Sequence, residues 1–201
     1  MLKKIYYLLA ALLLLTTLSL SAGCGSKNQS QGTAPQKATF RSMDDIKKSG
    51  KLIIGVFSDK APFGYVDKDG NYQGYDVYFA ERLAKDLGVK AEYISLEPAN
   101  RVEYAKTGKV DIVLANFTVT PARAEEVDFA LPYMNVALGV VSPEGRVITT
   151  LEDWDENDEM IVISGTTAET YLTENYPNIK LQKYDTYANA KNALENGNAA
   201  A

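Results

Sequence analysis

The residues best suited to chemistry lie between positions 111 and 133, where an apolar run gives way to polar side chains and an arginine. The run at 112–115 is typical of a strand covered on both faces. Asn116, Thr118 and Thr120 follow it and supply one amide and two hydroxyls. Polar groups at the end of a buried strand are well placed to contact a ligand.

Arg123 is the one cation of this polar segment. Thr120 is expected to cap a helix and Pro121 to be its first residue, so Arg123 falls in the first turn. A lone cation is unusual there, because the helix dipole favours anions at that end. A guanidinium beside hydroxyls and free backbone N–H groups can bind a carboxylate. Arg123 could instead pair with the acidic residues that follow it, and the pattern at this point favours neither interpretation.

The composition limits the chemistry that these residues can support. The chain has 201 residues, a formal net charge of −5, no histidine and one cysteine. An acidic chain argues against nucleic acid as a partner. The missing histidine removes the commonest general base and zinc ligand, and one cysteine cannot form an intrachain disulfide or a cysteine-cluster metal site. We therefore expect a binding protein and not an enzyme, with no metal and no cofactor.

The amino terminus predicts export. Two lysines precede an apolar run at 5–20, which is too short for a comfortable membrane span, and small residues then lead to Cys24. This segment resembles the bacterial lipoprotein signal, although Ser21 stands where leucine is usual. We predict a signal peptide at 1–23, lipidation of Cys24 and a flexible tether at 24–39, which would anchor the protein at the outer face of the cell membrane or in the periplasm. An ordinary signal peptide with an incidental cysteine is the alternative.

The elements that must position the polar segment alternate between strands and helices, which predicts an α/β fold with a mainly parallel sheet. Turn signals and composition divide the chain into a first lobe at 40–138, a hinge crossing at 139–145 and a second lobe at 146–201. Expected strands of the first lobe and its exit are 51–57, 90–95, 112–115 and 136–141. Expected strands of the second lobe are 160–163 and 179–184.

The second lobe offers a further carboxylate-binding turn at Gly165, Thr166 and Thr167, at the start of a helix. Thr167 could also serve simply as the N-cap of that helix. This turn and the strand-end position of Arg123 together shift the interpretation of Arg123 towards a carboxylate receptor. The last expected helix, at 187–194, has no strand after it, so we expect the second lobe to be incomplete.

Two segments carry a family resemblance: GYDVYFAERLAKDLG at 74–88 and DIVLANFTVTPARAEEVDFALPYM at 111–134. They resemble the bacterial extracellular solute-binding proteins of family 3, the amino-acid-binding proteins of ABC importers. The segment at 96–123 is most similar to the branch that binds cysteine, aspartate or glutamate. Tyr78 departs from an acidic position of the family signature. The resemblance implies a two-lobed, hinged fold of the periplasmic-binding-protein type II, which closes on one amino acid.

The resemblance also implies roles for individual residues near the ligand's carboxylate. Arg123 matches the arginine that grips the α-carboxylate, and Asn116 and Thr118 match the small polar residues beside it. The turn of the second lobe matches the one that closes over that carboxylate, through Gly165, Thr166 and Thr167.

Other matched residues would line the pocket for the ligand's side chain. Phe63, Phe57 and Lys60 match the loop of the first lobe, and Phe117 is expected among the ligand contacts. Arg101 matches a second arginine that faces the side chain in binders of acidic amino acids. The aspartate that would bind the ligand's ammonium is expected after residue 201.

These observations predict a lipid-anchored receptor that captures a polar or acidic amino acid, such as cysteine, glutamate or aspartate, for an ABC importer. Its expected partners are the amino acid, the importer permease and the membrane through Cys24, and we expect a monomer. Two alternatives stay open: a periplasmic enzyme of the same fold, either a dehydratase or a peptidoglycan-cleaving enzyme, and a ligand-sensing module of a signalling receptor.

Overall fold

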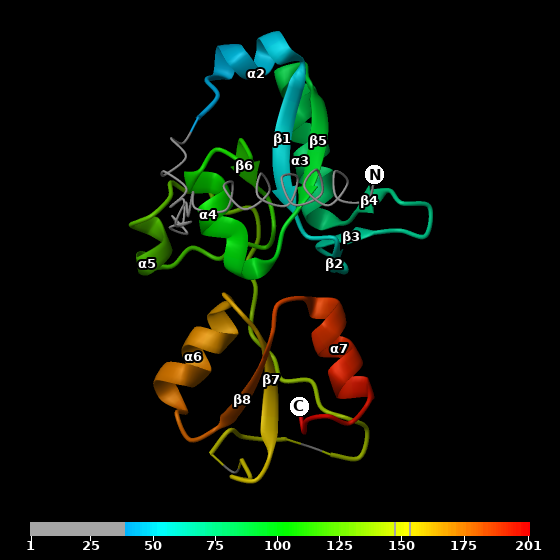
Figure 1. Ribbon diagram of the computed structural model, residues 1–201, viewed down its shortest axis with the longest axis vertical. Helices are drawn as coiled ribbons and strands as arrows, with labels where there is room; N and C mark the ends of the chain where they lie inside the picture. The colour runs from blue at the N-terminus through cyan, green and yellow to red at the C-terminus, as the bar shows by residue number, and fades with distance from the viewer. Residues whose placement is uncertain (1–38, 147, 153) are drawn as a thin grey trace, which may run out of the picture. The chain divides into compact units, whose positions relative to one another are not determined.

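Three parallel strands organise the first part of the chain (Figure 1). In the computed structural model, which describes residues 39–146, 148–152 and 154–201, β1 (Lys51–Val56) lies between β5 (Lys90–Ser95) and β6 (Ile112–Val113). β1 pairs with β5 along its whole length, from Lys51 opposite Lys90 to Val56 opposite Ser95. We call β5–β1–β6 the amino-terminal sheet. The carboxyl ends of the three strands lie at the same end of the sheet. The predicted ligand contacts come after these strand ends in the chain.

Helices accompany the strands of this sheet. They are α2 (Met43–Ser49), α3 (Tyr75–Leu87), the 3-10 turn η1 (Pro98–Asn100), α4 (Arg101–Lys106) and α5 (Pro121–Ala124). Of these, α2, α3 and α4 contact the strands. α3 turns Ala80 and Ala84 onto the buried strand residues Leu52, Ile54 and Val56. Because Ala80 and Ala84 are small, the helix can approach β1 closely.

A small antiparallel sheet follows β1 and carries two predicted pocket residues. It consists of β2 (Asp59–Lys60), β3 (Gly64–Val66) and β4 (Tyr72–Gln73). β3 and β4 are joined by a turn in which the Asp67 carboxylate accepts the backbone N–H groups of Asp69 and Asn71 at 2.9 Å each. A carboxylate that accepts two backbone donors fixes a tight turn. The hairpin in this way holds Lys60 at the end of β1.

A second parallel pair, which we call the carboxy-terminal sheet, is formed by β7 (Glu159–Ile163) and β8 (Lys180–Tyr184). The helices α6 (Thr167–Asn175) and α7 (Tyr187–Glu195) follow its two strands. Met160, Val162, Leu172 and Ile179 form its buried cluster. Residue 201 extends the pairing, because its carbonyl accepts the N–H of Ile161 at 2.7 Å.

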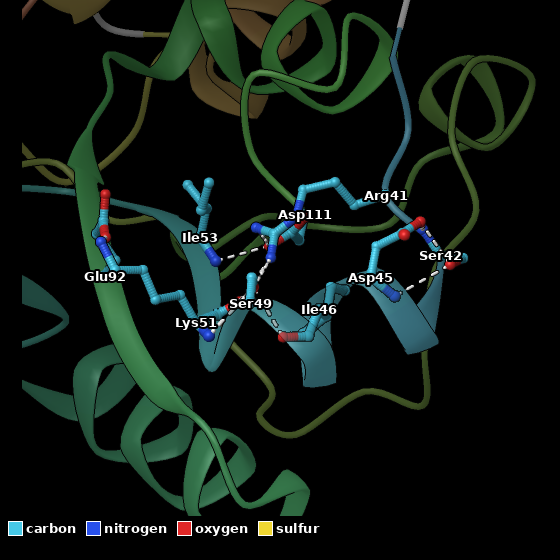
Figure 2. A network of polar contacts seen from close by, with 9 residues as sticks. All are labelled: Arg41, Ser42, Asp45, Ile46, Ser49, Lys51, Ile53, Glu92 and Asp111. Carbon is cyan, nitrogen blue, oxygen red and sulfur yellow. Dashed lines mark hydrogen bonds and ion pairs between the residues drawn. The ribbon is translucent and has the colours of Figure 1, made fainter.

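Polar contacts stabilise the opposite end of the amino-terminal sheet, near the amino ends of β1 and β6 (Figure 2). The Asp111 carboxylate, just before β6, accepts the N–H of Ile53 at 2.7 Å and an N–H of Arg41 at 2.8 Å. Arg41 also donates to the carbonyl of Lys51 at 2.8 Å. α2 begins beside this cluster with a reciprocal Ser42 and Asp45 cap. These contacts hold the segment before α2 against β1 and β6, at the end of the sheet away from the predicted site.

The strand expected at 136–141 is absent: the structure assigns no strand to these residues. Leu138 and Val141 are 58% and 70% exposed. The prediction was wrong because an apolar run forms a strand only beside a partner with free backbone groups, and neither sheet extends its ladder to this segment.

The predicted signal peptide, Cys24 and all but the last residue of the predicted tether lie outside the described residues. Within 39–146, 148–152 and 154–201, no helix is long and apolar enough to cross a membrane.

Candidate functional site

The predicted ligand contacts gather where β1 and β6 end. Phe57 directly follows β1, Asn116 lies shortly beyond β6, and Arg101 is the first residue of α4. β2 adds Lys60 to the same edge. Carboxyl ends of parallel strands are the usual place for a ligand in an open α/β sheet. The local fold therefore brings three of the predicted cationic and aromatic residues together.

Arg101 is buried and its donors are used on main-chain carbonyls. Its side chain donates to the carbonyls of Pro98 (2.9 Å), Ala115 (3.2 Å) and Asn116 (3.1 Å). It also reaches the carbonyl of Gly165 at 2.9 Å, beyond β7. Only 3% of Arg101 is exposed. In this arrangement Arg101 joins the loops of the amino-terminal sheet to the turn before α6, and its predicted contact with a ligand's side chain stays a prediction.

Arg123 reaches the same carbonyl. It donates to the carbonyl of Thr118 at 2.8 Å and to that of Gly165 at 2.9 Å. The predicted helix start is confirmed, because Thr120 caps α5 by accepting the N–H of Arg123 and Pro121 is the first helical residue. Arg123 therefore does not depend on the acidic residues after it for these contacts. The hydroxyl of Thr118 has no part in them.

The two guanidinium groups flank one aromatic ring. Their central carbons lie 4.6 Å (Arg101) and 4.8 Å (Arg123) from the centroid of Phe117. Burial, followed by the nearby charge of Arg123, lowers the pKa of Arg101 to about 10, and burial lowers the pKa of Arg123. Two desolvated cations that share a neutral oxygen favour the arrival of an anion. The site is electrostatically suited to a carboxylate.

The turn that supplies this oxygen requires a glycine. Gly165 has φ +76, and a Cβ there would lie 2.5 Å from the Cα of Ala99. Its N–H donates to the Glu169 carboxylate at 2.7 Å. The N-cap of α6 is Thr166, not Thr167, because the Thr166 side chain accepts the N–H of Glu169. Thr167 becomes the first helical residue, so the turn of predicted residues is present but Thr166 is already used as a cap.

Lys60 sits among aromatic rings and donates to Asn116. Its Nζ is 2.6 Å from the Asn116 Oδ1. The same Nζ lies 4.4 Å from the ring centroid of Tyr187, 5.1 Å from that of Phe63 and 5.5 Å from that of Phe57. Cations over aromatic faces are attracted by the ring quadrupole. The predicted pocket residues Phe57, Lys60 and Phe63 are therefore in one cluster.

The environment of Lys60 disfavours its charged form. Burial, and then the charge of Arg101, lower its pKa to about 8, while Asp76 and Asp59 act in the opposite direction. A lysine with such a pKa is part charged and part neutral in mildly alkaline solution. The group can therefore respond to pH or to an arriving anion.

Behind this cluster lies a buried carboxylate that the sequence did not single out. Asp76, on the first turn of α3, accepts the N–H of Asn116 at 2.9 Å and the hydroxyl of Tyr133 at 2.7 Å. It is 0% exposed. Burial raises its pKa although both hydrogen bonds act against that rise. An acidic residue in the first turn of a helix is commonly interpreted as a surface partner of the helix dipole. Only the position of Asp76 next to the buried face of α3 could have identified it as a buried group.

Tyr187 was also missed, because it is the first residue of a helix far along the chain. Its ring meets the Phe57 ring edge-on at a centroid distance of 5.6 Å. Nearby, the N–H of Ala188 donates to the Asp59 carboxylate at 2.9 Å. These contacts bring the start of α7 to the small antiparallel sheet. A sequence pattern gives no direct signal for such a long-range contact.

A hollow of about 330 Å³ opens beside the cluster, and neither Arg101 nor Arg123 is among its lining residues. Its lining includes Ser58, Asp59, Glu97, Tyr104 and Asp185. Arg101 is instead buried under the loops that it binds, and Arg123 is half-buried. Among residues 39–146, 148–152 and 154–201, no group of acidic, histidine or cysteine side chains is arranged to hold a metal ion.

Comparison with protein families gives one clear match. Residues 52–198 match the family described as bacterial extracellular solute-binding proteins, family 3. Among curated proteins, the ABC transporter glutamine-binding protein GlnH of Bacillus subtilis is 29% identical over 97% of this chain and 72% of its own length.

Two solved structures are more similar in sequence. The solute receptor for L-cysteine of Neisseria gonorrhoeae is 50% identical, with a TM-score of 0.77. The cysteine-binding protein of Campylobacter jejuni is 52% identical, with a TM-score of 0.75. Each match covers 80% of this chain and 66% of the solved chain. All three relatives are named as binding proteins or receptors, which agrees with the expectation of a binding protein and not an enzyme.

Proposed function

The chain belongs to the bacterial extracellular solute-binding proteins of family 3, and from this premise we propose that it is the amino-acid-binding component of an ABC importer. Its α/β fold is that of the type II periplasmic binding proteins, as the sequence predicted. We also propose the predicted division into lobes at 40–138 and 146–201, joined by a crossing at 139–145. Binding between two such lobes would close the cleft by a hinge motion.

The observation that carries the proposal is the meeting of Arg101 and Arg123 on the carbonyl of Gly165. A carbonyl offers a partial charge, whereas an α-carboxylate offers a full one and two oxygens. Charge-assisted contacts between arginine and carboxylate are roughly twice as strong as neutral hydrogen bonds. We infer that an incoming α-carboxylate takes over donors of Arg123 that Gly165 holds in this structure.

The remaining surroundings favour a small polar or acidic side chain. Lys60 adds a third positive charge beside Arg101 and Arg123, among the aromatic groups Phe57, Phe63 and Tyr187. Within the predicted set of cysteine, glutamate and aspartate, we put L-cysteine first. The support is the identity of 50% and 52% with two proteins described as cysteine receptors or binders.

The setting of the protein in the cell is part of the proposal. Family members are described as extracellular solute-binding proteins. We propose an exported protein that is lipid-anchored through Cys24, acts as a monomer and delivers its amino acid to the permease of an importer. Incorporation of labelled palmitate by the wild type and its loss in Cys24→Ala would test the anchor.

A calorimetric titration of the full-length protein with the common amino acids tests the ligand class. We expect binding of L-cysteine or an acidic amino acid, and loss of that binding in Arg123→Ala. Arg82→Ala is the matched control, because Arg82 is an exposed arginine of α3 that pairs with Asp86. Wild-type affinity in Arg123→Ala would overturn the assignment of Arg123, and no binding of any amino acid by the wild type would overturn the function.

A further inference from the structure

Asn116 is the point where the contacts of the candidate site meet. Its side-chain oxygen accepts from Lys60, and its carbonyl accepts from Arg101. Its backbone has φ 43, in the left-handed region, which makes it the one non-glycine residue of positive φ found in the described chain. Asparagine tolerates this conformation better than most residues, but the surroundings must still hold it there.

The group that holds it is Asp76. The Asp76 Oδ2 accepts the N–H of Asn116 at 2.9 Å, while Oδ1 accepts the hydroxyl of Tyr133 at 2.7 Å. Each oxygen thus has a donor of its own, from a segment on either side of α5. The carboxylate is fully buried, so its role in this structure is to accept donors from within the protein. A buried charge is kept only where its surroundings compensate for the loss of water.

We propose that Asp76 is a positioning residue of the binding site, which fixes the left-handed Asn116 and thereby sets where Lys60 and Arg101 present their charges. The inference rests on the proposed function only in calling this cluster a binding site. The relay itself consists of contacts within the protein, and it can be tested without any ligand.

The charge of Asp76 has a second effect, on Lys60. The Lys60 ammonium is surrounded by Asp59 on its own strand, Asp76 on α3, Arg101 on α4 and Tyr187 on α7. Burial and Arg101 lower the pKa of Lys60. Asp76 and Asp59 raise it, and the effect of Asp76 is the larger of the two. If the Asp76 charge is removed, the Lys60 ammonium should lose its proton at a lower pH.

Asp76→Asn tests this directly, because it keeps the shape and removes the charge. The measurement is an NMR titration of the Lys60 side chain in the full-length, ligand-free protein. The wild-type midpoint should lie at about 8. We expect the variant to titrate lower, by on the order of one pH unit. An unchanged midpoint in a folded variant would overturn the proposal.

Asp111→Asn is the matched control. Asp111 is also a nearly buried carboxylate that accepts one backbone N–H and one side-chain donor, from Ile53 and Arg41 (Figure 2). Asp111 lies near the amino ends of β1 and β6, whereas the candidate site lies at their carboxyl ends. Its substitution should lower stability as Asp76→Asn does, but leave the Lys60 midpoint where it is. An equal shift in both variants would mean a general effect of instability and would also overturn the proposal.

Tyr133→Phe keeps the test decisive if Asp76→Asn does not fold, because it removes only one donor from the carboxylate. We expect the Asn116 amide to exchange with solvent roughly tenfold faster than in the wild type, since its acceptor is less firmly held. Wild-type exchange in this variant contradicts the relay.

Calorimetry with L-cysteine as the probe then separates this inference from the proposed function. If Lys60 titrates lower in Asp76→Asn and the variant binds L-cysteine roughly tenfold more weakly or worse, both stand. If the wild type binds no amino acid but the Lys60 shift is seen, the relay stands and the function fails. If L-cysteine binds to Asp76→Asn as to the wild type, the relay does not position the site and the inference fails.

Discussion

Arg101 and Arg123 donate to a single oxygen, the carbonyl of Gly165, each at 2.9 Å. Arg101 lies on α4, between β5 and β6 in the chain, and Arg123 lies on α5, after β6, whereas Gly165 follows β7. The contact therefore links the two parts of the chain through the groups proposed to bind the ligand. On the proposed function, a ligand that competes for these donors would also change a contact between the two parts of the chain.

Replacing Arg101 by alanine should lower the stability of the protein. Its guanidinium satisfies the buried carbonyls of Pro98, Ala115 and Asn116, which would lose their donors. We expect a loss of about 3 kcal/mol or more in the free energy of unfolding, measured by urea denaturation. The role suggested by family resemblance predicts instead a selective loss of affinity for acidic amino acids. Unchanged stability with a selective loss of affinity would contradict this stabilising role of Arg101 and support its contact with the ligand.

Replacing Gly165 by alanine should disrupt the shared acceptor. The substitution places a methyl group 2.5 Å from the Cα of Ala99 and also strains a residue of φ +76. Together these effects should cost roughly 2–5 kcal/mol, measured as the shift of the thermal or urea transition. Gly197→Ala is the control, because Gly197 has φ +71 with nothing within 4 Å of its added Cβ. A similar loss in both variants would mean that strain alone, and not the close contact with Ala99, explains the effect.

Lys60 should make the stability depend on pH above neutrality. Its pKa falls from 10.5 in the unfolded chain to about 8 in the folded one. Between these values the unfolded state holds more protons, so the free energy of unfolding should rise with pH across this window. In Lys60→Met this rise should be smaller, when unfolding is followed at several pH values from 7 to 10. Lys85→Met, which removes an exposed lysine of α3, controls for the loss of surface charge. The same slope in Lys60→Met and the wild type would refute this account.

The order of elements was readable from the sequence because strand and helix periodicities are local. β1, β5 and the cap at Thr120 follow from such patterns. The strand expected at 136–141 failed because pairing depends on a neighbour that the local pattern does not contain. The N-cap of α6 is Thr166, one residue before the alternative cap Thr167 considered from the sequence. A local pattern does not fix a helix boundary to a single residue.

The candidate site was only partly predictable for a related reason. Residue type and position marked Arg123, a cation beside hydroxyls at the end of an expected strand, whereas Lys60 and Phe63 were predicted only from the family resemblance. Residue type and position did not mark Asp76, whose role depends on a contact with Asn116 forty positions away. Nor could they decide whether the Arg101 guanidinium faces a ligand or the backbone, since both are compatible with an arginine at the start of α4.

The ion pair between Arg41 and Asp111 should contribute to stability and not to binding. Asp111 has a side-chain exposure of 5% and Arg41 of 22%, and the two meet at the amino ends of β1 and β6. Ligand contacts are expected at the other ends of these strands. Arg41→Ala should therefore lower the free energy of unfolding by about 1–2 kcal/mol, because Asp111 would keep the N–H of Ile53 but lose its charged partner.

Calorimetry and denaturation on the same preparation separate these two effects for Arg41→Ala. Amino-acid affinity should stay within about twofold of the wild type, since rigid sheets rarely transmit a loss at one edge to the other. Arg82→Ala again serves as the control, because its pair with Asp86 is exposed at both side chains and such pairs contribute about 1 kcal/mol or less. A tenfold fall in affinity in Arg41→Ala without a fall in stability would show that the entering chain is coupled to the site. That result would place the Arg41–Asp111 pair among the residues that control binding, against the separation of the two strand ends argued above.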